Sequence, residues 1–246
     1  MPDPRRDWIV PDWPAPARVR AFITTRSGGV SAGPFASMNL GLRTDDDLKS
    51  VRTNRASLRE CLPAEPKWLL QVHGAEVVDA DSLKKPVEAD AAVARNPGSV
   101  CTVMIADCLP VLLTDRAGTV VAVAHAGWRG LAAGVVENTV RAMGTSPDQV
   151  LAFLGPAIGP SAFEVGADVR DAFLSRSGDA ASAFVSHKPG KWLADLFELG
   201  RRRLRSSGVT KIYGGGICTY SDPQRFFSHR RDKVTGRMAA FIWLTD

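Results

Sequence analysis

Three short apolar runs between Val100 and Ala124 constrain the fold of this chain more than any other feature. They cover residues 100–105, 111–114 and 119–124; each is partly β-branched and too short for an ordinary helix. Runs of this kind are typical of strands buried on both faces of a sheet. The pattern therefore predicts a central sheet, and polar residues at the ends of its strands become candidates for a functional site.

Reactive side chains stand where these runs stop. Asp107 and Cys108 follow the first run, and His125 follows the third, directly before a glycine-containing turn. Another histidine, His73, ends an apolar run at residues 68–72 in the same way. Glycines next to such positions let the backbone or a ligand approach closely. We expect His73, Cys108 and His125 to converge on one metal ion.

Two imidazoles and one thiolate suit zinc, and three protein ligands leave one coordination position open. Zinc with an open position lowers the pKa of bound water and polarises a substrate oxygen. Asp107 is a candidate general base, or a residue that orients a histidine. Adjacent residues of a strand point to opposite faces, so either role requires the backbone to turn at Asp107.

Other chemistries fit the same residues. Cys108 and His125 could act as nucleophile and base, as in cysteine hydrolases. Copper is an alternative because two histidines, a cysteine and a methionine describe a blue-copper site. Met104 is a poor axial ligand, since four strand residues separate it from Cys108 by roughly 13 Å. The 4 histidines of the chain argue against a multicopper cluster. A binding protein with structural zinc is disfavoured because three ligands do not close a tetrahedral site.

Length and composition bound the class of protein. The 246 residues, 45% of them hydrophobic, fit one large domain over residues 1–246. No apolar run approaches the roughly 20 residues of a membrane span, and no signal-peptide core opens the chain. The 4 cysteines then indicate reduced thiols in the cytoplasm. The net charge of +5 suits an anionic small molecule and does not indicate nucleic acid or a membrane as partner.

Strand-like and helix-like segments mix along the chain, which predicts an α/β (mixed α+β) fold. Besides the central runs, strands are expected at residues 19–25, 68–73, 89–93, 150–154, 209–213 and 237–244. Helices are expected near residues 48–60, 130–143, 167–174 and 191–204. The remaining histidines have plain interpretations: His187 in an exposed polar turn, and His229 as a semi-buried, hydrogen-bonded residue.

Motifs distributed over nearly the whole chain resemble those of the YfiH family. They are Gly29-Val30-Ser31-Ala32-Gly33-Pro34, Asn39-Leu40-Gly41, Asn54-Arg55, Gln71-Val72-His73-Gly74, Ala106-Asp107-Cys108-Leu109-Pro110, His125-Ala126-Gly127-Trp128-Arg129-Gly130, Gly155-Pro156-Ala157-Ile158-Gly159, Cys218-Thr219 and Phe226-Phe227-Ser228-His229-Arg230-Arg231-Asp232. The resemblance implies two sheets packed between helices, related to bacterial cytotoxic necrotizing factor and its cysteine-histidine site. It also implies zinc held by His73, Cys108 and His125.

The activity implied by the resemblance is purine nucleoside chemistry. Members are described as cleaving adenosine, inosine, guanosine or methylthioadenosine with phosphate, and as deaminating adenosine. A bacterial branch is described as a peptidoglycan editing factor, an amide hydrolase that removes serine from a UDP-muramoyl precursor. The family has also been labelled a polyphenol oxidase or laccase, which the histidine count argues against. Ser37, Asn39 and Arg55, which match the family's motifs, are the expected substrate contacts.

Overall fold

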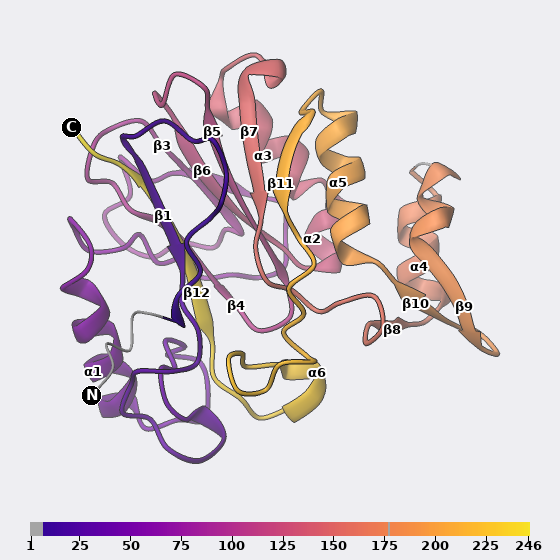
Figure 1. Cartoon of the computed structure of the whole chain (residues 1–246), viewed down its shortest axis with the longest axis horizontal. Coiled ribbons are helices and arrows are strands. Elements are labelled where there is room, and N and C mark those ends of the chain that lie inside the picture. The colour runs from indigo at the N-terminus through magenta and orange to yellow at the C-terminus, as the bar shows by residue number, and fades with distance from the viewer. Residues whose placement is uncertain (1–6, 177) are drawn as a thin grey trace.

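Two β-sheets packed face to face form the centre of the computed structural model, which describes residues 7–176 and 178–246 (Figure 1). The larger sheet has the strand order β11-β7-β5-β6-β3-β2. The smaller has the order β1-β12-β4. Their strands are β1 (Val19–Ile23), β2 (Val77–Asp79), β3 (Ala91–Ala94), β4 (Cys101–Ile105), β5 (Leu109–Asp115), β6 (Val121–Ala126), β7 (Val150–Leu154), β11 (Lys211–Gly214) and β12 (Met238–Leu244).

Helices cover the outer faces of both sheets. The helices are α1 (Leu48–Arg59), α2 (Trp128–Ala133), α3 (Val135–Met143), α4 (Ala167–Leu174), α5 (Leu196–Ser206) and α6 (His229–Asp232). Helices α2, α3 and α5 pack on the six-stranded sheet, and α1 packs on the outer face of the three-stranded sheet. A third sheet, β8-β10-β9, lies to one side with α4; its strands are β8 (Glu164–Val165), β9 (Phe184–Lys188) and β10 (Lys191–Ala194).

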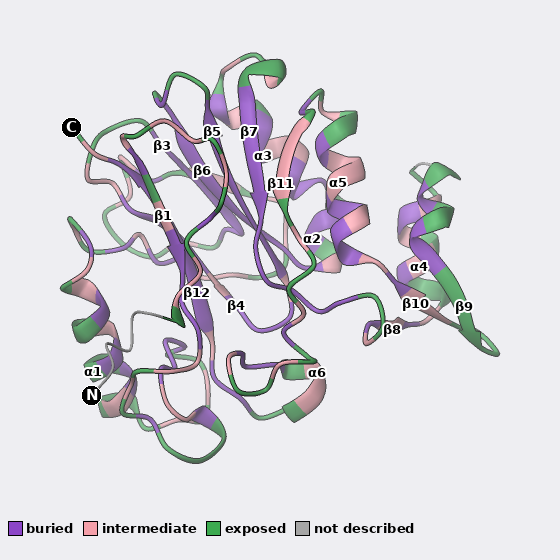
Figure 2. Cartoon of the chain, viewed as in Figure 1, coloured by how far each residue is buried: buried purple, intermediate pink, exposed green. Residues whose placement is uncertain are grey.

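The central strands are buried on both faces, as their unbroken apolar runs predict. Leu112 of β5 points into the core between the two sheets, whereas its neighbour Leu113 points into the core beneath the helices. This alternation follows from the two-residue repeat of a strand. Figure 2 shows β5, β6 and β7 as buried along their lengths. The mixed α/β class is therefore confirmed, while the relation to cytotoxic necrotizing factor stays a prediction.

Several expected elements differ in detail. The helix expected at residues 130–143 is two helices, because Gly134 between them adopts a left-handed φ of 100°. The segment at Lys191–Ala194, expected to start a helix, is strand β10; the helix begins at Leu196, where the Asp195 side chain caps it. The strand expected at residues 68–73 is not formed: the segment makes one isolated bridge, at Leu70, and turns in a bend at His73.

The helices at residues 48–60 and 167–174 are confirmed as α1 and α4, with α1 ending one residue earlier. The strands expected at 19–25, 89–93, 150–154, 209–213 and 237–244 are present as β1, β3, β7, β11 and β12; β7 has the expected bounds and the others have shifted ends. Among the described residues, no helix has the length and apolar character needed to cross a membrane.

Candidate functional site

His73, Cys108 and His125 come together at one end of the six-stranded sheet. One ligand atom from each lies within 4.8 Å of the other two. The Cys108 Sγ atom is 3.9 Å from His73 Nε2, and the two imidazole rings meet edge to face with centroids 4.9 Å apart. The predicted convergence is present, and two nitrogens and a sulfur at these separations can hold one metal ion.

Adjacent elements bring the three side chains together. His125 is the penultimate residue of β6, and Cys108 immediately precedes β5; Leu109 pairs with Ala126 across the antiparallel ladder. His73 lies in the bend before β2 with a φ of 61°. Asp107 has a φ of 92°, so the backbone does turn at this position. Positive φ values at non-glycine residues are uncommon and gather at functional sites.

Asp90 organises both histidines and was missed in the sequence. This fully buried carboxylate accepts a hydrogen bond from His125 Nδ1 at 2.8 Å. It also accepts from three successive backbone N–H groups, those of Val72, His73 and Gly74, at 2.7–3.1 Å. Because Asp90 occupies Nδ1 of His125, Nε2 is left for a ligand. A lone aspartate between alanines at the start of an apolar run was the available signal.

Charges couple Cys108 and His125. Burial raises the pKa of the Cys108 thiol, but the charge of His125 and hydrogen bonds from both histidines outweigh it and lower the pKa to about 6. Burial lowers the pKa of His125, but the Cys108 thiolate and Asp90 outweigh it and raise the pKa to about 9. A thiolate beside an imidazolium is therefore the favoured form at neutral pH when no metal is bound.

Gly127 leaves the space that the cluster needs. A Cβ atom at this position would lie 2.9 Å from Cys108 Sγ and 3.1 Å from His73 Cδ2. Gly130, one turn into α2, is similarly tight, since its Cβ would lie 2.6 Å from the Gly74 carbonyl oxygen. The glycines of this segment thus let α2 pack directly against the bend that carries His73.

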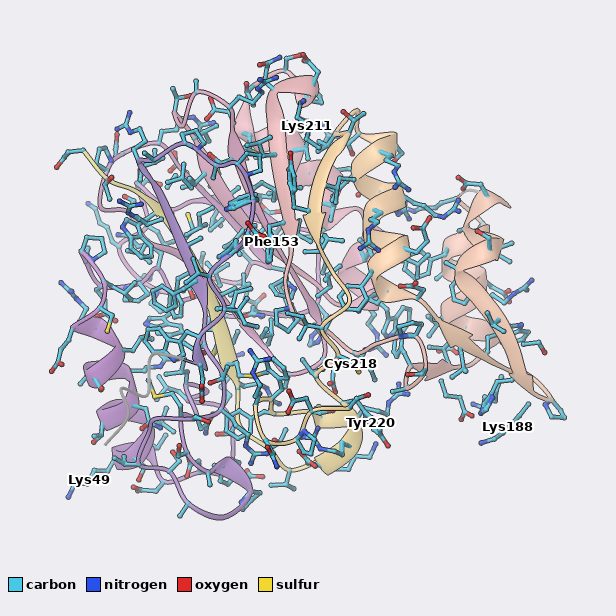
Figure 3. All side chains as sticks on the ribbon, in the orientation of Figure 1. Lys49, Phe153, Lys188, Lys211, Cys218 and Tyr220 are labelled. Carbon is cyan, nitrogen blue, oxygen red and sulfur yellow. The ribbon has the colours of Figure 1, made fainter. Side chains whose placement is uncertain are left out.

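The Asp107 side chain is engaged away from the histidines. Its Oδ1 accepts from Thr219 Oγ1 at 2.6 Å, and its Oδ2 accepts from Ser228 Oγ at 3.0 Å and the Arg230 backbone N–H at 2.7 Å. These contacts tie the turn before Cys108 to α6 and to the loop that carries Cys218 and Tyr220 (Figure 3). Asp107 as general base stays a prediction; the observed contacts position Cys108.

The three expected substrate contacts have different surroundings. Arg55 lines a cavity of about 510 Å³ that also contains the His-Cys-His cluster. Its guanidinium lies 3.7 Å over the Trp68 ring, and burial lowers its pKa to about 10. Asn39 is buried, where its side chain bonds to Thr44, Asp46 and the backbone of Gly41 and Arg237. Ser37 Oγ bonds to the backbone of Gly29 and Arg26. Ser37 and Asn39 are outside the cavity lining and shape the loop around it.

The cavity is lined by further side chains that the sequence analysis does not propose as site residues. Besides Arg55 and the cluster, its lining residues are Gly41, Leu42, Arg43, Thr44, Trp68, Leu69, Leu70, Gln71, Pro86, Met104, Ala106, Arg129, His229 and Arg237. His229 is exposed here, with Nδ1 hydrogen-bonded to the Lys233 carbonyl oxygen at 2.9 Å, so the expectation of a semi-buried residue is wrong. His187 belongs to strand β9, with Nε2 3.4 Å from Glu164, rather than to a turn.

Comparison with known proteins places this geometry in a family. A family model described as multi-copper polyphenol oxidoreductase laccase matches residues 20–245. A purine nucleoside phosphorylase of Pseudomonas aeruginosa is 57% identical over 97% of this chain and 99% of its own. The purine nucleoside phosphorylase YfiH of Escherichia coli is 52% identical over 96% and 98%. A Neisseria meningitidis crystal structure superposes with a TM-score of 0.95 at 50% identity, covering 98% of this chain and all of the other.

Proposed function

Because the chain belongs to the YfiH family, we propose that it is a zinc-dependent purine nucleoside phosphorylase. Its substrates would be adenosine, inosine, guanosine or methylthioadenosine, with phosphate as the second substrate. The relatives' names support this proposal across nearly the full chain. The observation that carries it here is one cavity in which the His-Cys-His cluster meets four arginines and no aspartate or glutamate among the lining residues. Such a cavity favours an anionic substrate.

The donor atoms fit zinc. Asp90 holds Nδ1 of His125, which leaves Nε2 available, and the pKa of Cys108 favours the thiolate. Bound zinc would act as a Lewis acid towards a substrate oxygen. The multi-copper site of the family description fits less well, because it needs many histidine ligands. The chain has 4 histidines in all, and one of them, His187, lies on the third sheet, where it pairs with Glu164.

The residues of this chain would serve phosphorolysis by holding the two substrates in line. A phosphate oxygen attacks C1′ of the ribose, the C1′–N9 bond breaks, and the purine leaves with the bonding electron pair and takes up a proton. The arginines neutralise the phosphate charge, and the apolar wall of Trp68, Met104 and Leu70 excludes water from the reacting bond. Adenosine deamination, also part of the proposal, would instead add water at C6 of the base and break the C6–N6 bond, which releases ammonia and leaves inosine.

The test is release of hypoxanthine from inosine by the purified protein, with and without phosphate. We expect phosphate-dependent release together with ribose 1-phosphate, lost in His73→Ala and Cys108→Ala and retained in Cys218→Ser. Release at the same rate without phosphate would indicate a hydrolase and contradict the proposal. The alternative, hydrolysis of a UDP-muramoyl serine amide, stays a prediction; serine release without phosphate would support it.

A further inference from the structure

The cavity beside the His-Cys-His cluster concentrates positive charge without balancing it. Four arginines line it, Arg43, Arg55, Arg129 and Arg237, and no carboxylate does. No salt bridge joins any of the four to an aspartate or glutamate in the described part of the chain. Guanidinium groups gathered around one cavity repel one another, so an anion that binds between them relieves this repulsion.

Two of the four arginines have structural partners that fix them in place. Arg55 donates from Nε to the Leu40 carbonyl oxygen at 2.9 Å and stacks on Trp68. Arg237 donates from Nη1 to the carbonyl oxygens of Thr235 and Gly236. The Arg237 side chain also packs against Gly41, where a Cβ would lie 2.8 Å from its Cγ. Arg237 therefore keeps its Nε and Nη2 donors for a ligand.

The Arg129 side chain has no polar partner among the described residues. Among residues 7–176 and 178–246 its side chain makes no hydrogen bond and no ion pair, and its guanidinium lies 4.4 Å over the Trp128 ring. Stacking on a ring leaves the N–H edge of an arginine free to donate to an oxyanion in a bidentate way. Arg129 stands two residues after Gly127, which packs closely against Cys108 and His73, and its side chain lines the same cavity as the cluster.

Arg237 lines the same cavity from a segment near the C-terminus, just before β12. Its backbone N–H bonds to Asn39 Oδ1, and its side chain lines the same cavity as Cys108 and Arg129. Burial lowers the pKa of Arg237, while the charges of Cys108 and Asp107 oppose this effect. A half-buried guanidinium is stabilised further when an anion binds beside it, because the anion offsets the cost of its partial desolvation.

We infer that Arg129 and Arg237 form the binding site for inorganic phosphate beside the His-Cys-His cluster. This inference rests on the proposed function and assigns its second substrate to named residues. Arg129 supplies a free N–H edge and Arg237 supplies held donors, which together suit the three equivalent oxygens of a phosphate.

Phosphate binding tests the site directly. Isothermal titration of the holoenzyme with inorganic phosphate would compare wild type with Arg129→Gln, Arg237→Gln and the control Arg52→Gln on the exposed side of α1. Loss of one charged donor pair should weaken the affinity roughly tenfold to a hundredfold, and Arg129→Lys should restore part of it. The control should bind as wild type does. Unchanged affinity in Arg129→Gln would overturn the inference.

Steady-state kinetics separate this site from the proposed function. The Arg129→Gln enzyme should show a raised KM for phosphate and a nearly unchanged KM for inosine. Arginine-dependent phosphate binding by a protein that does not cleave inosine would support the site and reject the phosphorylase. Cleavage with an unaltered KM for phosphate in Arg129→Gln would reject the site alone. Tighter binding of inosine 5′-monophosphate than of inosine and phosphate together would show that the arginines recognise a phosphate ester, and would also reject it.

Discussion

Asp90 and His125 are joined twice, through their side chains and through their backbones. The carboxylate accepts from Nδ1 at 2.8 Å, and the Asp90 carbonyl oxygen accepts from the His125 N–H at 2.7 Å. The same carboxylate holds the backbone of the bend that carries His73. One buried residue therefore fixes the orientation of one histidine and the position of the other.

Asp90→Asn should weaken metal binding about 10- to 100-fold, because an amide cannot accept all four hydrogen bonds that the carboxylate accepts. Competition with a chromophoric chelator measures this affinity. Asp115→Asn is the matched control: Asp115 is also buried and accepts from Thr119 and Val120, but it lies at the far end of β5. Both variants should lose stability, yet only Asp90→Asn should lose metal affinity; equal metal affinity in the two would contradict the positioning role.

Gly127→Ala should disturb the cluster without disturbing the fold. Gly127 has a φ of −62° and a ψ of 158°, which alanine adopts without strain, so the only penalty is the contact with Cys108 Sγ and His73 Cδ2. We expect at least a tenfold fall in kcat/KM with a Tm within a few degrees of wild type. Gly178→Ala, where the added Cβ meets nothing within 4 Å, serves as control. Full activity in Gly127→Ala would show that Cys108 and His73 can move to accommodate the added methyl group, and would contradict this prediction.

The metal-free protein should show an unusually acidic thiol at Cys108. Its lowered pKa means that the thiolate persists as the pH falls and disappears only through about pH 6. The rate of iodoacetamide labelling of Cys108, followed by peptide mass spectrometry, should therefore rise through about pH 6 and level off above it. His125→Gln removes the neighbouring cation, so the inflection should move up by roughly one unit or more. An inflection near pH 8–9 in the wild-type protein would refute the coupling.

Metal content should depend on one of the four cysteines. We expect about one zinc per chain in the wild type, and a loss of most of it in Cys108→Ser, because serine does not replace a thiolate ligand. In Cys218→Ser the hydroxyl can take over the hydrogen bonds from Gly159 and Ser221, so zinc should be retained. Elemental analysis of the purified proteins decides this. A well-folded wild type without metal would favour Cys108 as a nucleophile with His125 as base.

The cluster could be predicted because its members end apolar runs, and the strand pattern places such ends together. The supporting residues could not. Arg237, which directly precedes β12, lines the cavity, and its backbone N–H bonds to Asn39 Oδ1 198 residues away in the sequence. Asp107 is likewise engaged by Ser228 across 121 residues. Contacts of this range leave no periodic signal in the sequence, so the positions of these side chains required the structure.

The secondary structure, too, is only partly predictable from the sequence. Strands with uninterrupted apolar runs were predicted within a few residues, since burial on both faces demands that pattern. The leucine spacing of Lys191–Ala194 continues into α5 and so predicts a helix; pairing with β8 and β9 overrides that local pattern. Gly134 interrupts an otherwise continuous apolar face, and a single glycine inside such a face does not by itself predict a break.

The strand order β1-β12-β4 has a consequence for how the protein is made. Among the described residues, β12 is the one strand that pairs with β1, whose other edge carries an isolated bridge between Ile9 and Ile23. Thr24 bonds to Ala239 across 215 residues. A chain emerging from the ribosome therefore carries β1 and β4 with open edges until β12 has been synthesised. Closure at such a separation is slow and leaves edge strands free to pair wrongly in the meantime.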